Sequence, residues 1–320
     1  MENRKRSAND EPIEKAEEAK KSKETKQLYS TPAAYGCRKG ERSDMQDTHI
    51  MQPKFDLGAD KEFLSRSSFF AIFDGHAGPR ASEHCQRQMG KTVKEKLDKS
   101  SDFTTMTKSL KQSFTESYKS VDDEFLALAK QNKPMWKDGT TATTMIILNN
   151  VVYVANIGDS KVVVARKKDD GSFSPVCLTV DHNPMAHDER MRIQKTGATV
   201  KDGRINGIIE VSRSIGDLPF KSLGIISTPD LKKLTLTSND LFAIIACDGL
   251  WKSFSNVEAV TYASEQLEVA KKMDIQQEPN ESRKIAELRI VAERLASEAV
   301  RRKCGDNVSV IVVKLELIDC

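Results

Sequence analysis

The sequence predicts an α+β fold in which sheets pack together and are covered by helices. Three apolar runs are nearly continuous, as expected for strands buried on both faces, and they span Phe69–Phe73, Val151–Ala155 and Leu241–Ala246. A further strand, Thr143–Leu148, leads through Asn149-Asn150 into the second run. This short connection predicts a hairpin and therefore antiparallel pairing.

Helical periodicity provides the other half of the fold prediction. It is found at residues 81–97, at residues 106–129 and most clearly near the C-terminus, where one apolar stripe contains Ile285, Leu288, Ala292, Leu295 and Ala299. Gly305 is the expected end of this last helix, and residues 308–317 are the expected final strand. The polar segment 273–282 contains Pro279 and is expected to be a surface loop.

Length and composition predict one large domain preceded by a tail. We expect residues 1–28, which are rich in Lys, Glu and Ala, to form a mobile charged tail and residues 29–320 to form one folded domain. The basic cluster Arg4-Lys5-Arg6 fits either a nuclear import signal or an ordinary solvated tail.

Several classes of protein are disfavoured by composition. No apolar run approaches the roughly 20 residues of a membrane-spanning helix, and the N-terminus lacks the apolar region of a signal peptide. Six scattered cysteines without a CxxC pair favour reduced thiols, and a net charge of only +3 does not indicate nucleic acid as a partner. We therefore expect a monomer in the cytoplasm, and also in the nucleus if the tail is an import signal, with no membrane or nucleic-acid partner.

Aspartates accompany the ends of the predicted strands. Asp74, Asp159 and Asp248 follow the three apolar runs, and Asp306 comes just before the final strand. In an antiparallel sheet the start of one strand lies beside the end of its neighbour, so these four residues could meet at one edge. A single Asp-Gly pair is more often simple turn chemistry, whereas four such aspartates favour a cluster.

Crowded carboxylates repel one another unless they share protons or surround a cation, and oxygen ligands favour Mg²⁺ or Mn²⁺. Two ions held by a bridging carboxylate can deprotonate a shared water and stabilise an in-line displacement at phosphorus. The sequence therefore predicts hydrolysis of a phosphate ester that needs no protein nucleophile.

Two further side chains fit such a site. Arg42 could hold a phosphate through two parallel hydrogen bonds, although an exposed loop arginine with no such role is the commoner case. His76 could protonate the departing oxygen, or it could cap the Asp-Gly turn in which it lies. The residues alone leave both pairs of alternatives open.

Seven segments, in the same order, resemble the type-2C metal-dependent Ser/Thr protein phosphatase family between about Tyr35 and Val313. They are Arg42–Asp47, Phe73–Gly78, Gly139–Ala142, Ala155–Ser160, Val211–Asp217, Ala246–Trp251 and Asp306–Val310. Three more segments are similar to the integrin-linked kinase-associated branch of that family, and they are Trp136–Gly139, Glu189–Lys195 and Asp202–Arg204.

The resemblance implies a four-layer α-β-β-α sandwich of two antiparallel sheets flanked by helices. It implies that Asp74 bridges two Mg²⁺ or Mn²⁺ ions, that Gly75 offers its backbone carbonyl, and that Asp248 and Asp306 complete the ligands. A water bridging the two ions would attack the phosphorus atom.

The same resemblance gives roles to the remaining candidates and to the substrate. It implies that Arg42 holds the substrate phosphate and that His76 is the general acid. The implied substrates are phosphoserine and phosphothreonine proteins, and the closer branch implies substrates in kinase signalling.

Two positions depart from the family pattern. Gln46 stands where Glu is usual, and a glutamine can still hydrogen-bond a metal-bound water. Lys252 stands where Asp is usual, and its positive charge disfavours a third divalent ion beside Asp159. We therefore expect two well-held ions and a weak or absent third, and Lys252 could pair with Asp159 instead.

These departures motivate one alternative, a catalytically weak family member that binds phosphoproteins as a scaffold. The sequence argues against it, because it retains Asp74, Asp248, Asp306, Arg42 and His76. A second alternative keeps two-metal chemistry in a nuclease or phosphodiesterase, which would favour a broad basic channel. The nearly neutral net charge gives that alternative no support.

Overall fold

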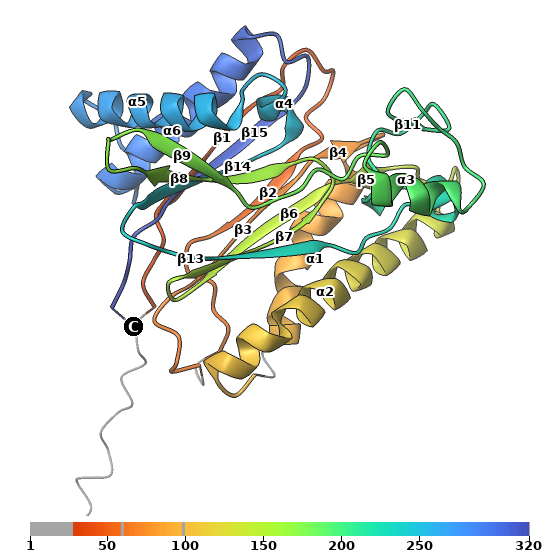
Figure 1. The fold of residues 1–320 in the computed structure, drawn as a ribbon, viewed down its shortest axis with the longest axis horizontal. Coiled ribbons are helices and arrows are strands. Elements are labelled where there is room, and N and C mark those ends of the chain that lie inside the picture. The colour runs from red at the N-terminus through yellow and green to blue at the C-terminus, as the bar shows by residue number, and fades with distance from the viewer. Residues whose placement is uncertain (1–27, 59–60, 98–99, 320) are drawn as a thin grey trace, which may run out of the picture.

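Two five-stranded antiparallel sheets pack face to face and are covered by helices (Figure 1). The computed structural model describes residues 28–58, 61–97 and 100–319. The first sheet has the strand order β1-β15-β14-β8-β9, and the second has the order β13-β7-β6-β3-β2. This arrangement confirms the predicted α-β-β-α sandwich. The predicted mobile tail lies outside the described residues except for its last residue, Leu28, so its boundary remains a prediction.

The strands of the first sheet are β1 (Ala33–Arg38), β8 (Lys161–Lys167), β9 (Phe173–Cys177), β14 (Asp240–Ala246) and β15 (Val308–Lys314). Those of the second are β2 (Thr48–Gln52), β3 (Ser67–Phe73), β6 (Ala142–Leu148), β7 (Val151–Ile157) and β13 (Asp230–Thr235). Short strands form two smaller sheets near the edge, and they are β4 (Gly75–His76), β5 (Gly139–Thr140), β10 (Val200–Lys201), β11 (Arg204–Ile205) and β12 (Ile215–Gly216).

Strand β3 shows why the apolar runs are continuous. Successive side chains of a strand point to opposite faces, and both faces of β3 are covered. Phe69 and Phe73 lie in the core shared with helices α1 (Arg80–Leu97) and α2 (Phe103–Gln131), whereas Phe70 and Ile72 lie in the core between the two sheets. All four side chains are fully buried, which confirms the expectation drawn from the sequence.

The long helices form the outer layers. Helices α1 (Arg80–Leu97) and α2 (Phe103–Gln131) cover the second sheet, and α5 (Asn256–Lys272) and α6 (Arg283–Arg301) cover the first. Shorter helices are α3 (His187–Gln194), α4 (Asp248–Trp251) and the 3-10 helix η3 (Leu218–Leu223). No helix within the described ranges is both long and apolar enough to cross a membrane.

The predicted hairpin is confirmed, because β6 and β7 pair from Leu148↔Val151 onwards and Asn149 adopts a φ of 52° in the connection. The predicted end of α6 is wrong. The helix ends at Arg301, and Lys303, with a φ of 61°, takes the left-handed position that was expected of Gly305. Its N–H donates to Val300 O, so the terminal carbonyls are satisfied before the glycine is reached.

Two other boundaries also differ from the prediction. The final strand ends at Lys314 rather than at residue 317. Helix α5 was not predicted, because it buries mainly alanines and leaves Val257 and Val269 exposed, so its apolar stripe is weak. The polar segment after α5 is the mostly exposed loop that the sequence predicts.

Candidate active site

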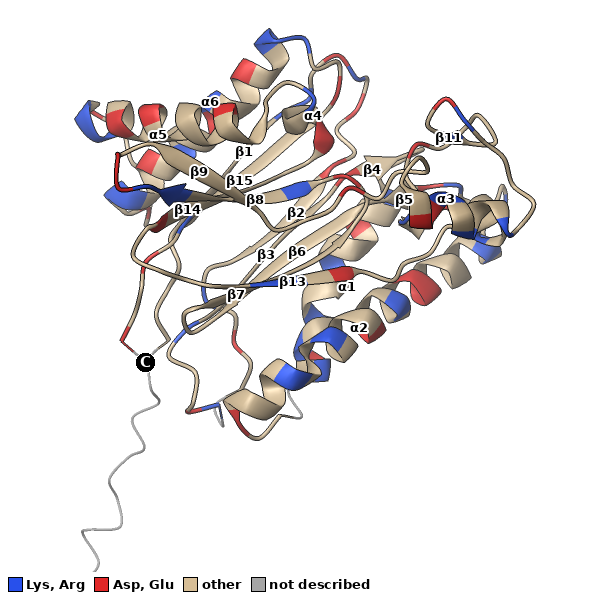
Figure 2. Ribbon diagram, viewed as in Figure 1, with Lys and Arg blue, Asp and Glu red and all other residues tan. Residues whose placement is uncertain are grey.

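A cavity of about 760 Å³ lies at the edge where strands of both sheets end. Its lining includes Asp74, Asp159, Asp248 and Asp306. The first two follow β3 and β7 of the second sheet, whereas the last two lie at the end of β14 and before the start of β15 in the first sheet. The predicted meeting of the four aspartates is confirmed, and it occurs at the seam between the two sheets. Figure 2 shows acidic residues gathered near β4 and α4, whereas both signs of charge occur along the outer helices.

The carboxylates are close enough to share a cation. Oxygen atoms from Asp74, Asp159 and Asp248 all lie within 4.8 Å of one another. Burial, and then the charges of Asp47 and Asp248, raises the pKa of Asp74 well above its ordinary value. Burial and the neighbouring Asp248 raise the pKa of Asp159 to about 7. The cluster therefore stores like-charge repulsion that protons or cations relieve.

Asp74 is held in place through its backbone. Its carbonyl accepts hydrogen bonds from Thr141 N at 2.9 Å and from Thr140 Oγ1 at 3.0 Å, and its own N–H donates to Thr141 Oγ1 at 3.2 Å. The next residue must be small, because a Cβ on Gly75 would lie 2.4 Å from Gln46 O. The Gly139–Ala142 segment and the loop containing Gln46 thus fix the Asp-Gly-His tripeptide.

Asp47 provides a test of whether a metal fits here. Both of its carboxylate oxygens are buried and have no hydrogen-bond partner among the described residues. Burial raises the pKa of Asp47 to about 7; the nearby side chains of Ser309 and Cys247 offset part of this effect, and the charges of Asp248 and Asp306 add to it. Ligand atoms of Asp47, Asp74 and Cys247 also lie within 4.8 Å of one another. An oxygen-rich cluster next to a buried carboxylate without a hydrogen-bond partner, that of Asp47, fits a hydrated divalent cation.

Arg42 lies at the rim of the cavity and pairs with a candidate metal ligand. Its Nε and Nη2 atoms each lie 3.0 Å from an oxygen of Asp306, while 60% of its side chain stays exposed. Asn307 fixes the loop that carries Arg42, because its Nδ2 donates to Lys39 O and Asp44 O and its Oδ1 accepts from Gln46 N. The guanidinium is therefore held beside the carboxylates and still reaches solvent.

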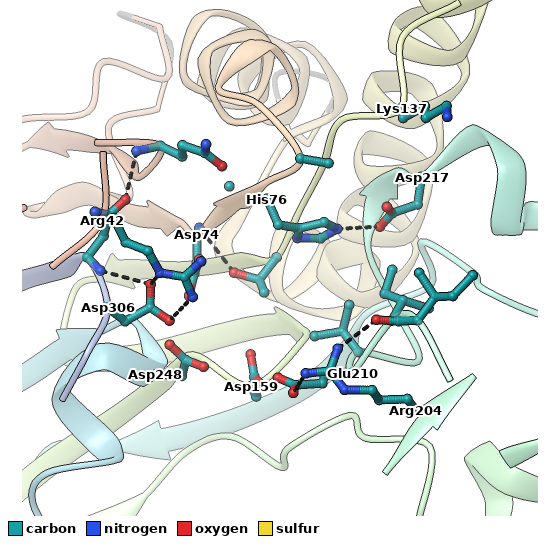
Figure 3. Close-up of a pocket in the computed structure, with 18 of the residues that line it drawn as sticks. Arg42, Asp74, His76, Lys137, Asp159, Arg204, Glu210, Asp217, Asp248 and Asp306 are labelled. Atoms are coloured by element: carbon teal, nitrogen blue, oxygen red, sulfur yellow. Dashed lines mark hydrogen bonds and ion pairs between the residues drawn. The ribbon is translucent and has the colours of Figure 1, made fainter. Parts of the chain in front are cut away.

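His76 does not cap a turn; it lies on β4 and points into the cavity (Figure 3). Its Nε2 lies 2.8 Å from Asp217 Oδ2, and the same oxygen accepts from Ser214 Oγ at 2.5 Å. Burial lowers the pKa of His76, but the buried Asp217 carboxylate outweighs that effect and the net pKa is raised. Gly139 packs against this pair, since a Cβ there would lie 2.4 Å from His76 Nε2.

The suggested pairing of Lys252 with Asp159 is wrong. Lys252 Nζ lies 2.5 Å from Asp248 Oδ2 and 3.3 Å from Asp306 Oδ2. Asp248 opens helix α4 and Lys252 follows it by four residues, so one helical turn brings the two side chains together. Gln46 is the other departure from the family pattern, and its side-chain oxygen Oε1 accepts a hydrogen bond from Gly78 N at 3.3 Å.

A model of the family described as Protein phosphatase 2C matches residues 33–308. The chain belongs to this family of serine/threonine phosphatases, as the order of its motifs predicts. It is 38% identical over 301 residues to the integrin-linked kinase-associated serine/threonine phosphatase 2C of Homo sapiens, covering 93% of this chain and 76% of that relative. It is 33% identical over 304 residues to a probable protein phosphatase 2C 67 of Oryza sativa subsp. japonica, covering 89% of this chain and 76% of the relative.

A solved structure supports the fold independently. The serine-threonine phosphatase 2C of Toxoplasma gondii superposes with a TM-score of 0.74 at 21% identity, covering 91% of this chain and 96% of that one. Membership of a metal-dependent phosphatase family favours phosphoprotein substrates over the nuclease alternative. The acidic cluster could hold a metal, as that membership requires.

Three residues of the site were not singled out from the sequence. Asp47 lies inside a recognised motif, but only packing shows that its carboxylate is buried without a partner. Asp217 and Asn307 also lie inside motifs, and each acts by contacting residues far away in the chain. The sequence signal that could have identified these three residues is their position inside the family motifs.

Proposed function

We propose that this phosphatase holds two divalent cations, Mg²⁺ or Mn²⁺, on the carboxylates of Asp74, Asp248 and Asp306 and on the Gly75 carbonyl. The convergence of four strand-end aspartates on one cavity supports this assignment most directly. When bound, two such ions activate water as a nucleophile and offset the charge of the reacting phosphate. The substrate is a phosphoserine or phosphothreonine protein.

The chain's own residues have separate tasks. Arg42 is assigned to the substrate phosphate, because its planar group matches two phosphate oxygens and already makes the same two-point contact with Asp306. His76 is assigned to proton donation to the departing serine or threonine oxygen. Asp217 occupies its Nε2, so Nδ1 is the ring nitrogen that remains for the substrate.

The test is phosphate release from a phosphothreonine peptide with and without Mn²⁺ or Mg²⁺. The expected result is metal-dependent release by the unmodified chain, and loss of that release in Asp74→Ala. The matched control is Asp123→Ala, which removes an exposed carboxylate on α2 outside the cavity and should keep full activity. Equal release by the unmodified chain and Asp74→Ala would overturn the mechanism.

The names of the mammalian relatives support a further proposal, that the substrates belong to kinase signalling. The test compares the phosphoproteins that bind to Asp74→Ala with those that bind to Asp123→Ala. If none of the proteins bound by Asp74→Ala belongs to kinase signalling, the proposal is contradicted. A monomeric state and a cytoplasmic or nuclear location remain predictions. Gel filtration and imaging of the full-length chain would test them.

A further inference from the structure

The cavity has a second side that differs in chemistry from the acidic one. Across from Arg42 and Asp306 it is lined by a segment that carries Arg204 and Glu210 (Figure 3). The apolar residues of this side, here called the apolar wall, are Ile208, Ile209, Val211, Pro219 and Phe220. The phosphate-binding assignments above use none of them.

The apolar wall is built on its own small core. Ile209 and Val211 belong to a buried cluster with Ile193, Ile205 and Ile225, and Phe220 packs against that cluster. The turn is closed by a hydrogen bond from Ile205 N to Ile209 O at 2.9 Å. These contacts hold the wall in place before any substrate arrives.

Ile208 is the exposed member of the wall. It is 60% exposed, more than any other large hydrophobic residue among those that the structure describes. Arg204 Nη1 donates to Ile208 O at 2.7 Å, so the residue is fixed in this position by its backbone. Scattered exposed apolar residues are common in proteins, but this one lines the same cavity as the catalytic carboxylates.

The charges beside Ile208 cancel each other. Arg204 forms an ion pair with Glu210, so the two charges offset each other and give this side no net charge of its own. A cavity of about 760 Å³ is also large enough for more than a phosphorylated side chain, since pockets of about 300–1,000 Å³ hold whole ligands. In a substrate, an apolar residue close to the phosphorylated residue therefore complements the apolar wall best.

We propose that the apolar wall binds a bulky apolar side chain that lies within two residues of the phosphorylated residue of the substrate. The inference rests on the proposed function, because it assumes that the phosphate sits among Arg42 and the carboxylates. The wall then selects among phosphopeptides by burying apolar surface that stays exposed in other sequences. Ile208 and Phe220 are its specificity-determining residues.

The test compares phosphothreonine peptides that are identical except for Leu or Ser at the positions flanking the phosphothreonine. The unmodified chain should hydrolyse the Leu peptides with a kcat/KM about tenfold higher, as expected for one apolar side chain in a pocket. Ile208→Ser should bring the Leu-to-Ser ratio close to one. The matched control is Val257→Ser on α5, which alters a 54% exposed valine outside the cavity and should keep the preference.

Hydrolysis measurements distinguish a failure of this inference from a failure of the proposed function. Hydrolysis of both peptides with no preference, or an unchanged preference in Ile208→Ser, would overturn this inference and leave the proposed function standing. Absence of metal-dependent hydrolysis of every substrate, including p-nitrophenyl phosphate, would overturn the proposed function and this inference with it.

Discussion

Replacing Lys252 with Met should tighten the binding of divalent cations. The ammonium group lies 2.5 Å from Asp248 and 3.3 Å from Asp306, and both carboxylates are proposed metal ligands. Burial alone would lower the pKa of Lys252, but these two carboxylates raise it, so the lysine stays charged. An arriving cation must therefore compete with a positive charge already held by its own ligands.

The magnitude follows from the exposure of the ion pairs. The Lys252 side chain is 45% exposed, so each pair contributes at most about 1 kcal/mol. Losing both pairs to the metal costs about 1–2 kcal/mol, which corresponds to about a 5- to 30-fold change in dissociation constant. We expect Lys252→Met to bind Mn²⁺ more tightly by that factor in calorimetric titrations of metal-stripped protein at low ionic strength.

The control is Lys137→Met. Lys137 lines the same cavity and is exposed, and it has no ion pair among the described residues. This control should leave Mn²⁺ affinity within about twofold of the unmodified chain. Equal or weaker Mn²⁺ binding by Lys252→Met would refute the competition argument, and a well-occupied third ion touching Asp159 in the unmodified chain would refute the expectation of a weak third site.

Two more substitutions test contacts outside the acidic cluster. Burial raises the pKa of Glu189, but hydrogen bonds from Arg192, Arg213 and Ser212 more than offset this and lower it to about 2 from an ordinary 4.5. Glu189→Gln should therefore cost about 3 kcal/mol of unfolding free energy at pH 7. Because a depressed pKa stabilises the fold above about pH 4.5 and loses that effect toward pH 2, the cost should shrink by about 2 kcal/mol at pH 3 in urea titrations; a cost that stays constant would contradict this origin. Asp217→Asn should lower kcat on a phosphothreonine peptide about tenfold or more while changing p-nitrophenyl phosphate hydrolysis much less, because only the peptide's leaving group needs a proton. Equal losses on both substrates would show that Asp217 does not act through His76.

The acidic half of the site could be predicted because its signals are local. An apolar run that ends in Asp identifies both a buried strand and the carboxylate at its edge, as at Asp74 and Asp248. Antiparallel pairing then places Asp306, just before β15, beside the end of β14. Sequence order and strand geometry together were therefore enough to predict that these residues meet at one edge.

The other contacts depend on packing that no local pattern encodes. His76 and Asp217 meet across 141 positions, and Asp217 reaches the histidine from a left-handed backbone conformation with a φ of 52°. Pairing of Lys252 with Asp159 was one possibility, but Lys252 lies one helical turn after Asp248 because of helix α4, and this four-residue helix has no clear sequence pattern. Asp47 shows the same limit, because its burial beside Asp74 and Cys247 depends on segments that are far apart in the chain.

The two pairs of carboxylates in the site are carried by different sheets, and this determines the spacing between them. Asp248 and Asp306 are carried by the first sheet, while Asp74 and Asp159 are carried by the second. The apolar wall is fastened to the second sheet as well, because Arg213 joins Glu189 of α3 to Asp230 at the start of β13. The spacing between the carboxylate pairs therefore depends on the core between the sheets, whereas the spacing between the wall and Asp74 depends on the small sheet β12-β5-β4 and on these ion pairs. Weakening those ion pairs should alter peptide preference before it alters the binding of metal.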